Sequence, residues 1–373
     1  PCVWLEDIIR IAMDTLHNSI KIIQRIQSHQ KTARAGTPTT TGEKQDAQES
    51  EFYAVILLMQ TISRLARITG VTQALLAKDI IHSISAVVAI AYECLLTKPS
   101  NQLPELAKQK KESVEFLELS CILLYYLSGT VKAAPRMIEA QCHAVLRDLW
   151  GKLLAVRSSP FAAELKFAAA SMELTTITVA VLGNLARNPF ARTTLIEKGL
   201  TAELAVLAQE HTVHLQMRRS GIEAISASAD SSKAGMDHED IDPVLSEKLL
   251  ATAVAALEEI ACDDVSACVI AQQGALRMLN VVATYASDIA LRAKAIVTIC
   301  NMLSSGDIAT LMSTVEDDMV AALDVLVLLH QEIVHYDLSK SGFIVTALHN
   351  LSCVEPGRLM MQNVGEGILH SVT

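Results

Sequence analysis

The hydrophobic positions in residues 179–200 predict two helices separated by a sharp break. The apolar residues that lead up to Leu185 fall on one stripe of a helix. Asn188 ends this helix, because the residue before a proline is pushed out of the α region and Pro189 follows. A short second helix then stops at Gly199, where a left-handed backbone costs glycine nothing.

The same pattern recurs along the whole chain. It can be aligned on one apolar residue per copy, which we call the anchor. The six anchors are Leu65, Leu127, Leu185, Ile260, Leu303 and Leu351. Apolar residues also stand three residues before and ten residues after nearly every anchor. Glycine stands fourteen residues after the anchor in three copies, at Gly199, Gly274 and Gly365. Offsets this constant indicate an internal repeat.

This pattern resembles the armadillo repeat, whose third helix ends in an Ala-Leu-x-Asn-Leu-type run. In that family a short first helix, a glycine and a second helix follow. The closest matches here are Leu182-Gly183-Asn184-Leu185-Ala186, Leu257-Glu258-Glu259-Ile260-Ala261 with Gln273-Gly274-Ala275-Leu276, and Leu348-His349-Asn350-Leu351-Ser352. The resemblance covers nearly the whole chain.

The resemblance implies an all-α fold, a right-handed α-solenoid of about six armadillo-like repeats, some of them degenerate. We expect a single solenoid over residues 1–373. A two-helix repeat of the HEAT type is the alternative. Separate short helices at 69–78, 189–198 and 264–273 are what would distinguish the armadillo repeat from it.

Length and composition agree with a solenoid. A chain of 373 residues is longer than one hydrophobic core usually supports, whereas each repeat of a solenoid packs only on its neighbours. Hydrophobic residues make up 51% of the chain and aromatic ones only 4%, which suits narrow helix–helix interfaces. Neither end shows a polar capping repeat, so we expect the chain to be part of a longer protein.

Three polar stretches interrupt the repeats, and we expect flexible insertions near 28–50, 97–113 and 229–243. The spacing between the third and fourth anchors far exceeds the ~40–47 residues of such a repeat. Either the second helix is very long there, or an extra helix begins near Thr212 and covers 212–228. The sequence leaves both alternatives open.

Charge and cysteine content exclude several classes of function. The net charge of −10 argues against a nucleic-acid-binding protein. No segment has the pattern of a signal peptide or a membrane span, so we expect no membrane association. The eight cysteines lack a CxxC pair and mostly stand among apolar residues. This is typical of buried free thiols in a cytoplasmic protein.

The sequence shows no pattern of catalytic or metal-binding residues. His211 and His214 lack the glutamate and the spacing of a zinc-protease helix. The acidic run 237–242 lacks the glycine of a calcium loop. No phosphate-binding loop and no nucleophile elbow occurs. We therefore expect no enzyme, no catalytic residue, no cofactor and no metal.

In armadillo proteins the third helices line a concave groove, and the residue just before the anchor often points into it. By this resemblance the groove positions are Arg64, Tyr126, Asn184, Glu259, Met302 and Asn350. Asn184 and Asn350 match the asparagine with which the family holds the backbone of an extended peptide. Import adaptors also need a tryptophan one turn earlier, where this chain has Ala180 and Thr346. A continuous clamp for basic signals is therefore not expected.

Arginines follow the same side of the repeats. Arg64, Arg67 and Arg187 are candidates for a basic strip that binds an acidic segment. The alternative is that they are solvated or paired with nearby carboxylates.

The predicted function is that of a non-catalytic protein–protein interaction scaffold. We expect it to bind other proteins through the concave groove and the inserted loops, as a cytoplasmic subunit of a larger cytoskeletal or ciliary assembly. The alternative is a transport or regulatory adaptor that binds extended peptide segments in its groove.

Overall fold

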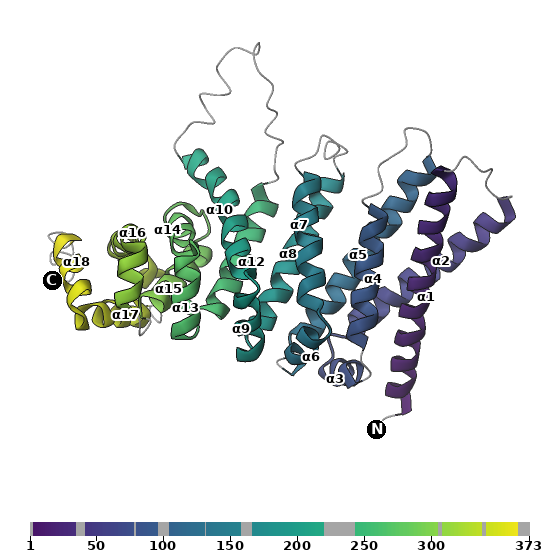
Figure 1. Ribbon diagram of the computed structural model, residues 1–373, viewed down its shortest axis with the longest axis horizontal. Coiled ribbons are helices and arrows are strands. Elements are labelled where there is room, and N and C mark those ends of the chain that lie inside the picture. The colour runs from purple at the N-terminus through teal and green to yellow at the C-terminus, as the bar shows by residue number, and fades with distance from the viewer. Residues whose placement is uncertain are drawn as a thin grey trace, which may run out of the picture. The chain divides into compact units, whose positions relative to one another are not determined.

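The fold is known from a computed structural model, which describes residues 3–34, 42–77, 80–95, 104–130, 132–157, 166–219, 243–304, 308–337 and 341–364. Within these ranges every regular element is a helix (Figure 1). In chain order the helices are α1 (Val3–Arg34), α2 (Gly42–Leu65), α3 (Thr69–Ala77), α4 (Ile80–Leu95), α5 (Pro104–Ser128), α6 (Ala133–Glu139), α7 (Cys142–Arg157), α8 (Lys166–Ala186), α9 (Pro189–Glu197), α10 (Leu200–Arg219), α12 (Pro243–Ile260), α13 (Asp264–Gln272), α14 (Ala275–Tyr285), α15 (Ile289–Leu303), α16 (Ile308–Tyr336), α17 (Ser341–Cys353) and α18 (Glu355–Val364). The all-α prediction is confirmed.

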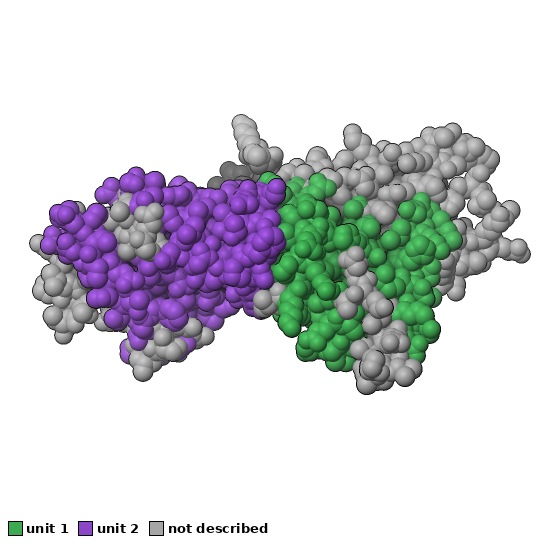
Figure 2. All heavy atoms as spheres, turned by 60° about the horizontal axis from the view of Figure 1, so that its bottom comes forward, with its two compact units in different colours: residues 1–185 green, residues 186–373 purple. Residues whose placement is uncertain are grey.

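The helices cluster into two compact units, residues 1–185 and 186–373, which Figure 2 shows in different colours. In the first unit α1 packs on α2 and α4, α2 packs on α5, and α4 packs on α5 and α7. In the second unit α10 packs on α12 and α14, α12 on α15, α14 on α16, and α15 on α17. Each helix therefore buries its apolar stripe against helices of its own repeat or of a neighbouring one.

The repeats have three helices, as the armadillo resemblance predicts. The short first helices α3, α6, α9 and α13 are each distinct from the second helices α4, α7, α10 and α14 that follow. The third helices α5, α8, α12 and α15 come next, and α1 and α2 act as a second and a third helix. In α16 the first and second helices are continuous but kinked at Val315, whose φ of −139° and ψ of 37° are not helical. The separate short helices decide against a two-helix repeat.

The turns between helices also follow the predicted pattern. Asn188 accepts a hydrogen bond from the backbone N–H of Ala191 at 3.2 Å and so caps α9. Fourteen residues after the anchor the backbone is left-handed in three repeats: φ is 73° at Gly199, 92° at Gly274 and 56° at Gln141. Glycine adopts this conformation without strain, whereas glutamine does not.

Helices extend into two of the stretches expected to be flexible. In 28–50, helix α1 continues to Arg34 and α2 begins at Gly42, so only 35–41 lies outside the described residues. In 97–113, α5 covers the part from Pro104 onward. Both segments are rich in Glu, Gln, Lys and Ala, which favour helices. The prediction of flexible insertions considered their polarity and not this helix propensity. The third stretch, 229–243, lies outside the described residues up to 242.

The long spacing before the fourth anchor is filled in part by a long second helix. Helix α10 runs without a break from Leu200 through Thr212 to Arg219, so no new helix begins at Thr212. Residues 220–242 lie outside the described part of the chain. In the described ranges no single helix is both long and apolar enough to cross a bilayer. Two pairs of helices reach that length and composition only together, across bends of 114° and 83°.

Candidate functional site: the third-helix faces

The six predicted groove positions fall on the six third helices, near their C-terminal ends. Arg64 on α2 is exposed, and the side chains on α5, α8, α12 and α17 are partly exposed. Met302 on α15 is fully buried, so the prediction that it points into a groove is wrong. A flexible apolar side chain at this position becomes part of the core instead.

In the first unit, Arg67 and Tyr126 connect two successive repeats. The guanidinium carbon of Arg67, two residues after the first anchor, lies 5.1 Å from the centre of the Tyr126 ring. Tyr126 stands just before the second anchor. This distance is within the ~6 Å of a cation–π interaction.

Asn184 continues the same relation on α8. Its amide nitrogen donates to the hydroxyl oxygen of Ser128 at 3.0 Å and lies 3.5 Å from the carbonyl oxygen of Tyr125. Ser128 directly follows the second anchor, at the C-terminal end of α5. Asn184 therefore caps the preceding third helix.

The second unit shows the same contacts with different residues. Arg187, two residues after its anchor, donates to a carboxylate oxygen of Glu259 at 3.0 Å. Glu259 stands just before the next anchor. Farther along, the amide nitrogen of Asn350 lies 3.4 Å from the carbonyl oxygen of Ser304, which follows the anchor of α15. We call these contacts between one anchor region and the next the third-helix ladder.

The third-helix ladder engages the side-chain amides of Asn184 and Asn350, the two asparagines expected to hold a peptide. The armadillo resemblance implies that Asn184 and Asn350 can hold a peptide backbone, which needs both the amide N–H and the carbonyl oxygen. Their N–H groups instead point to the preceding third helix. The asparagines therefore serve first to join repeats.

The arginines of the predicted basic strip differ in their partners within the third-helix ladder. Arg187 is paired with Glu259, as the alternative interpretation of the sequence expected. Arg67 is stacked on a neutral ring, and Arg64 is exposed on the same end of α2. Neither Arg64 nor Arg67 has a carboxylate partner among the described residues. The first unit therefore carries two unneutralised positive charges on this face.

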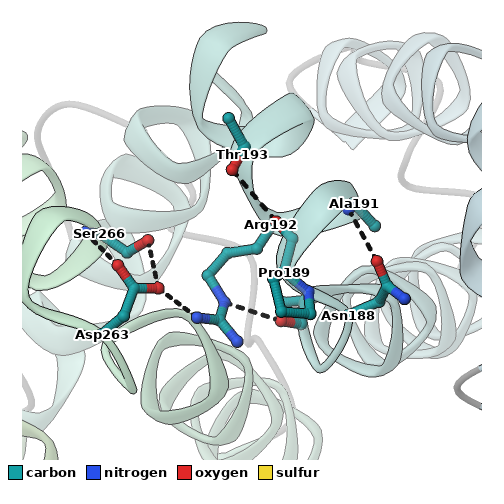
Figure 3. A network of polar contacts seen from close by, with 8 residues as sticks. Asn188, Pro189, Ala191, Arg192, Thr193, Asp263 and Ser266 are labelled. Atoms are coloured by element: carbon teal, nitrogen blue, oxygen red, sulfur yellow. Dashed lines mark hydrogen bonds and ion pairs between the residues drawn. The ribbon is translucent and has the colours of Figure 1, made fainter.

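A second set of polar contacts joins the short helices of the second unit (Figure 3). The Arg192 side chain, buried in α9, donates through Nε to the carbonyl oxygen of Ala186 at 2.9 Å and forms an ion pair with Asp263. Asp263 in turn accepts from the backbone N–H of Ser266 at 2.9 Å and caps α13. One arginine thus ties the end of a third helix to the start of the next short helix.

The same position caps the third helix in two other repeats. Seven residues after their anchors, Thr72 donates to the carbonyl oxygen of Ala66 and Arg358 donates to that of Ser352, at 2.5 and 3.0 Å. Sequence inspection missed this role. A hydrogen-bond donor seven residues after an anchor was the available signal.

The surroundings of Asp263 set its ionisation. Burial raises the pKa of this carboxyl group, but hydrogen bonds from the Ser266 backbone, from Arg192 and from the Ser266 hydroxyl outweigh burial and lower it below the usual value. Asp263 is therefore held as a carboxylate.

The described cysteines are free thiols. Burial raises the pKa of Cys121, Cys142 and Cys300 to about 12, so these thiols are unreactive at neutral pH. Cys262 and Cys353 are exposed. In the described ranges no three His, Cys, Asp or Glu side chains are grouped as metal ligands.

No family model matches the sequence, and no curated protein sequence matches it. Among solved structures, a designed armadillo repeat protein is 15% identical over 89% of this chain and 98% of its own, with a TM-score of 0.49. A second designed armadillo repeat protein, in complex with the peptide (KR)4, gives the same values. An engineered protein is 16% identical over 79% of this chain and 90% of its own, also with a TM-score of 0.49.

Likeness at this level carries no argument about function. The armadillo-type fold is instead defined by the short first helices, the left-handed turns after them and the regular anchors. Repeats of this kind present extended surfaces that other proteins bind.

Proposed function

We propose that this chain is a non-catalytic scaffold that binds other proteins through its third-helix faces, with the face of the first unit as the main contact. The supporting observation is the uncompensated pair Arg64 and Arg67. In a chain with a net charge of −10, two exposed arginines that have no carboxylate partner among the described residues leave a local positive field.

The chemistry of this pair favours an acidic segment. Arg64 lies in the last turn of α2 and Arg67 in the turn that follows the helix, and both side chains are exposed. Arg67 lies over the Tyr126 ring and is exposed, and a guanidinium that contacts an aromatic face can still donate hydrogen bonds from its N–H edge. An Asp or Glu side chain accepts two hydrogen bonds from such an edge, and this gives orientation as well as affinity.

Apolar side chains extend the face toward the start of α2. Tyr53 is 61% exposed and Leu57 is 67% exposed, at positions one turn apart. Exposed apolar groups that adjoin fixed charges are typical of protein interfaces. The proposed ligand is therefore a protein segment that combines a carboxylate with apolar residues.

The further assignment, to a structural subunit of a cytoskeletal or ciliary assembly, rests on the family resemblance alone. A cytoplasmic location is supported by the free cysteines, which are usual in reducing compartments. The inserted loops remain candidates for additional contacts. The adaptor alternative is less favoured, because the asparagines that would hold a peptide backbone are engaged in the ladder.

The experiment is quantitative capture of proteins from a cytoplasmic extract, followed by arrays of overlapping peptides from the captured proteins. With Arg64→Glu plus Arg67→Glu, we expect at least a tenfold loss of capture, about 1.4 kcal/mol. The matched control is the swap Arg187→Glu plus Glu259→Arg, which keeps its ion pair and should leave capture unchanged. Unchanged capture by the double arginine variant, or array segments without carboxylates, would contradict the proposal.

A further inference from the structure

The second helices of the second unit share one exposed face. Counted from the anchor of each repeat, the residue twenty-five positions later is Glu210 on α10, Tyr285 on α14 and Leu328 on α16. All three are exposed, Tyr285 by 36% and Leu328 by 76%. One turn earlier, Val206 on α10 and Asp324 on α16 are exposed too, Val206 by 56%. Because α14 packs on both α10 and α16 (Figure 1), these five residues belong to one surface, which we call the second-helix face.

The apolar residues of this face are not needed for packing between repeats. Each of the three helices already has an apolar stripe in the core, where Leu207 on α10, Val282 on α14 and Leu326 on α16 are at most 1% exposed. The outward apolar side chains are additional to this stripe. Apolar groups that gather on a surface and are rimmed by charges mark a site of interaction.

The second-helix face is also acidic. Glu210 and Asp324 belong to it, and the exposed Asp317 stands where the second-helix part of α16 begins. Among the side chains described on α10, α14 and α16, Arg277 is the one exposed Lys or Arg. Burial raises the pKa of Asp318, and the lowering effect of Arg277 does not offset burial and the charge of Asp317. The face therefore favours a cationic ligand.

The spacing of the apolar residues suits a helix laid across the three helices. Packed helices lie about 8–10 Å apart. An α-helix repeats a side chain on one face every seven residues, over about 10.5 Å, so apolar residues at this spacing can meet Val206, Tyr285 and Leu328 in turn. A helix also satisfies its own backbone hydrogen bonds. An extended segment would need backbone partners, and the backbone groups of α10, α14 and α16 are already used within the helices.

We propose that the second-helix face binds a basic amphipathic helix of another protein. The apolar residues of that helix cover Val206, Tyr285 and Leu328, and its Lys or Arg residues pair with Glu210 and Asp324. Opposite charges across an interface speed association and exclude like-charged partners. This ligand is opposite in charge to the segment proposed for the first unit, so the two sites take different partners.

Fluorescence anisotropy of a labelled peptide with the 373-residue chain tests this. The probe is a helical peptide of about 18 residues, enough to cross three packed helices, with Leu along one face and Lys on the others. Val206→Ser plus Leu328→Ser removes apolar contact area, and Glu210→Lys plus Asp324→Lys reverses two charges. We expect each pair of changes to weaken binding at least tenfold. Binding should also weaken as the salt concentration is raised.

The matched controls make the same kinds of change elsewhere in the second unit. Phe190→Ser plus Val265→Ser removes two apolar side chains that are exposed on α9 and α13. Glu197→Lys plus Asp264→Lys changes the net charge by the same amount as the reversal on the second-helix face, also at exposed positions. Both controls should bind the probe as the unaltered chain does. A shuffled peptide of the same composition, with Leu spread around the helix, should bind at least tenfold more weakly.

Several outcomes would overturn the proposal. They are an unaltered chain that does not bind the probe, controls that lose as much affinity as the variants, or a shuffled or proline-containing peptide that binds as tightly as the helical one. Circular dichroism establishes that each variant is folded, and if one variant is not, the other still provides the test. All variants keep Arg64 and Arg67, so capture of acidic partners reports separately on the proposed function.

Discussion

The two units have the same ladder but differ in what it leaves for a partner. In the second unit Arg187 meets Glu259, so the ladder neutralises its own charge. In the first unit the equivalent arginine, Arg67, meets the uncharged ring of Tyr126. In both units the arginine contacts the residue just before the next anchor. The difference in surface charge therefore comes from this residue, which is Glu259 in the second unit and Tyr126 in the first.

The residue just before the anchor therefore has two roles, to join successive repeats and to set the charge of the surface. A contact between successive anchors joins the repeats, and either an ion pair or a cation–π contact performs this. Only the second leaves a net charge on the surface. Recognition of an acidic partner is therefore expected of the first unit, and the corresponding face of the second unit serves cohesion.

The largest expected difference between the two units is in the stability contributed by the residue seven positions after the anchor. Arg192→Ala should lower the local stability of the α9–α13 region by about 2–3 kcal/mol, since it removes an ion pair and leaves the Ala186 carbonyl unpaired. Thr72→Ala, its counterpart in the first unit, removes only a neutral hydrogen bond and should cost about 1 kcal/mol. Hydrogen exchange of the flanking helices measures both. Equal losses would show that the charge of Arg192 has no added effect.

A smaller effect is expected at the left-handed turns. Gln141→Gly in the first unit should raise stability by about 1 kcal/mol, because glycine adopts a positive φ without strain. Gly199→Gln in the second unit is the reverse change. No atom lies within 4 Å of a Cβ placed at Gly199, so its cost comes from the backbone alone. Urea denaturation followed by circular dichroism provides the comparison, and changes of the same sign would contradict it.

The ladder contacts themselves should be weak. A double-mutant cycle on Arg187 and Glu259, whose side chains are 47% and 37% exposed, should give about 0.5 kcal/mol that decreases in high salt. A cycle on Arg67 and Tyr126 should give about 0.5–1 kcal/mol with little dependence on salt. A strong salt dependence in the second cycle would mean that Arg67 has a carboxylate partner after all.

The smallest expected effect is a pH dependence confined to the second unit. The pKa of Asp263 is lowered in the folded protein, so its contribution is present above the usual aspartate value, near 4, and is lost as the pH falls through the folded value. Asp263→Asn should remove this part of the acid sensitivity in thermal melts. The equivalent positions of the first unit, Ile68 and Thr130, do not titrate and should contribute none.

The sequence predicted the repeats well because they depend on local features. Anchors, prolines and glycines act within a few residues, and Gly199 and Gly274 have the left-handed backbone that their position requires. Polar composition was a poorer guide, since helices extend to Arg34 and start at Gly42 within a stretch expected to be flexible.

The surface was harder to predict, because it depends on contacts between residues far apart in the chain. Whether Arg187 is free depends on Glu259, and whether Met302 faces solvent depends on how α15 packs. Family resemblance indicated candidate positions near the ends of the third helices but not the direction of each side chain. The cap of Ala186 by Arg192 is a local contact, and it was missed although a donor recurs seven residues after several anchors.

The most direct test places a photo-crosslinking amino acid at Leu57, on the proposed binding face of α2, or at Ala89, which is exposed on the second helix α4. The account predicts that partners are crosslinked from Leu57, that Arg64→Glu plus Arg67→Glu abolishes this, and that Ala89 gives no product. Crosslinks from Ala89 alone, or crosslinks from Leu57 that persist after both charges are reversed, would contradict it.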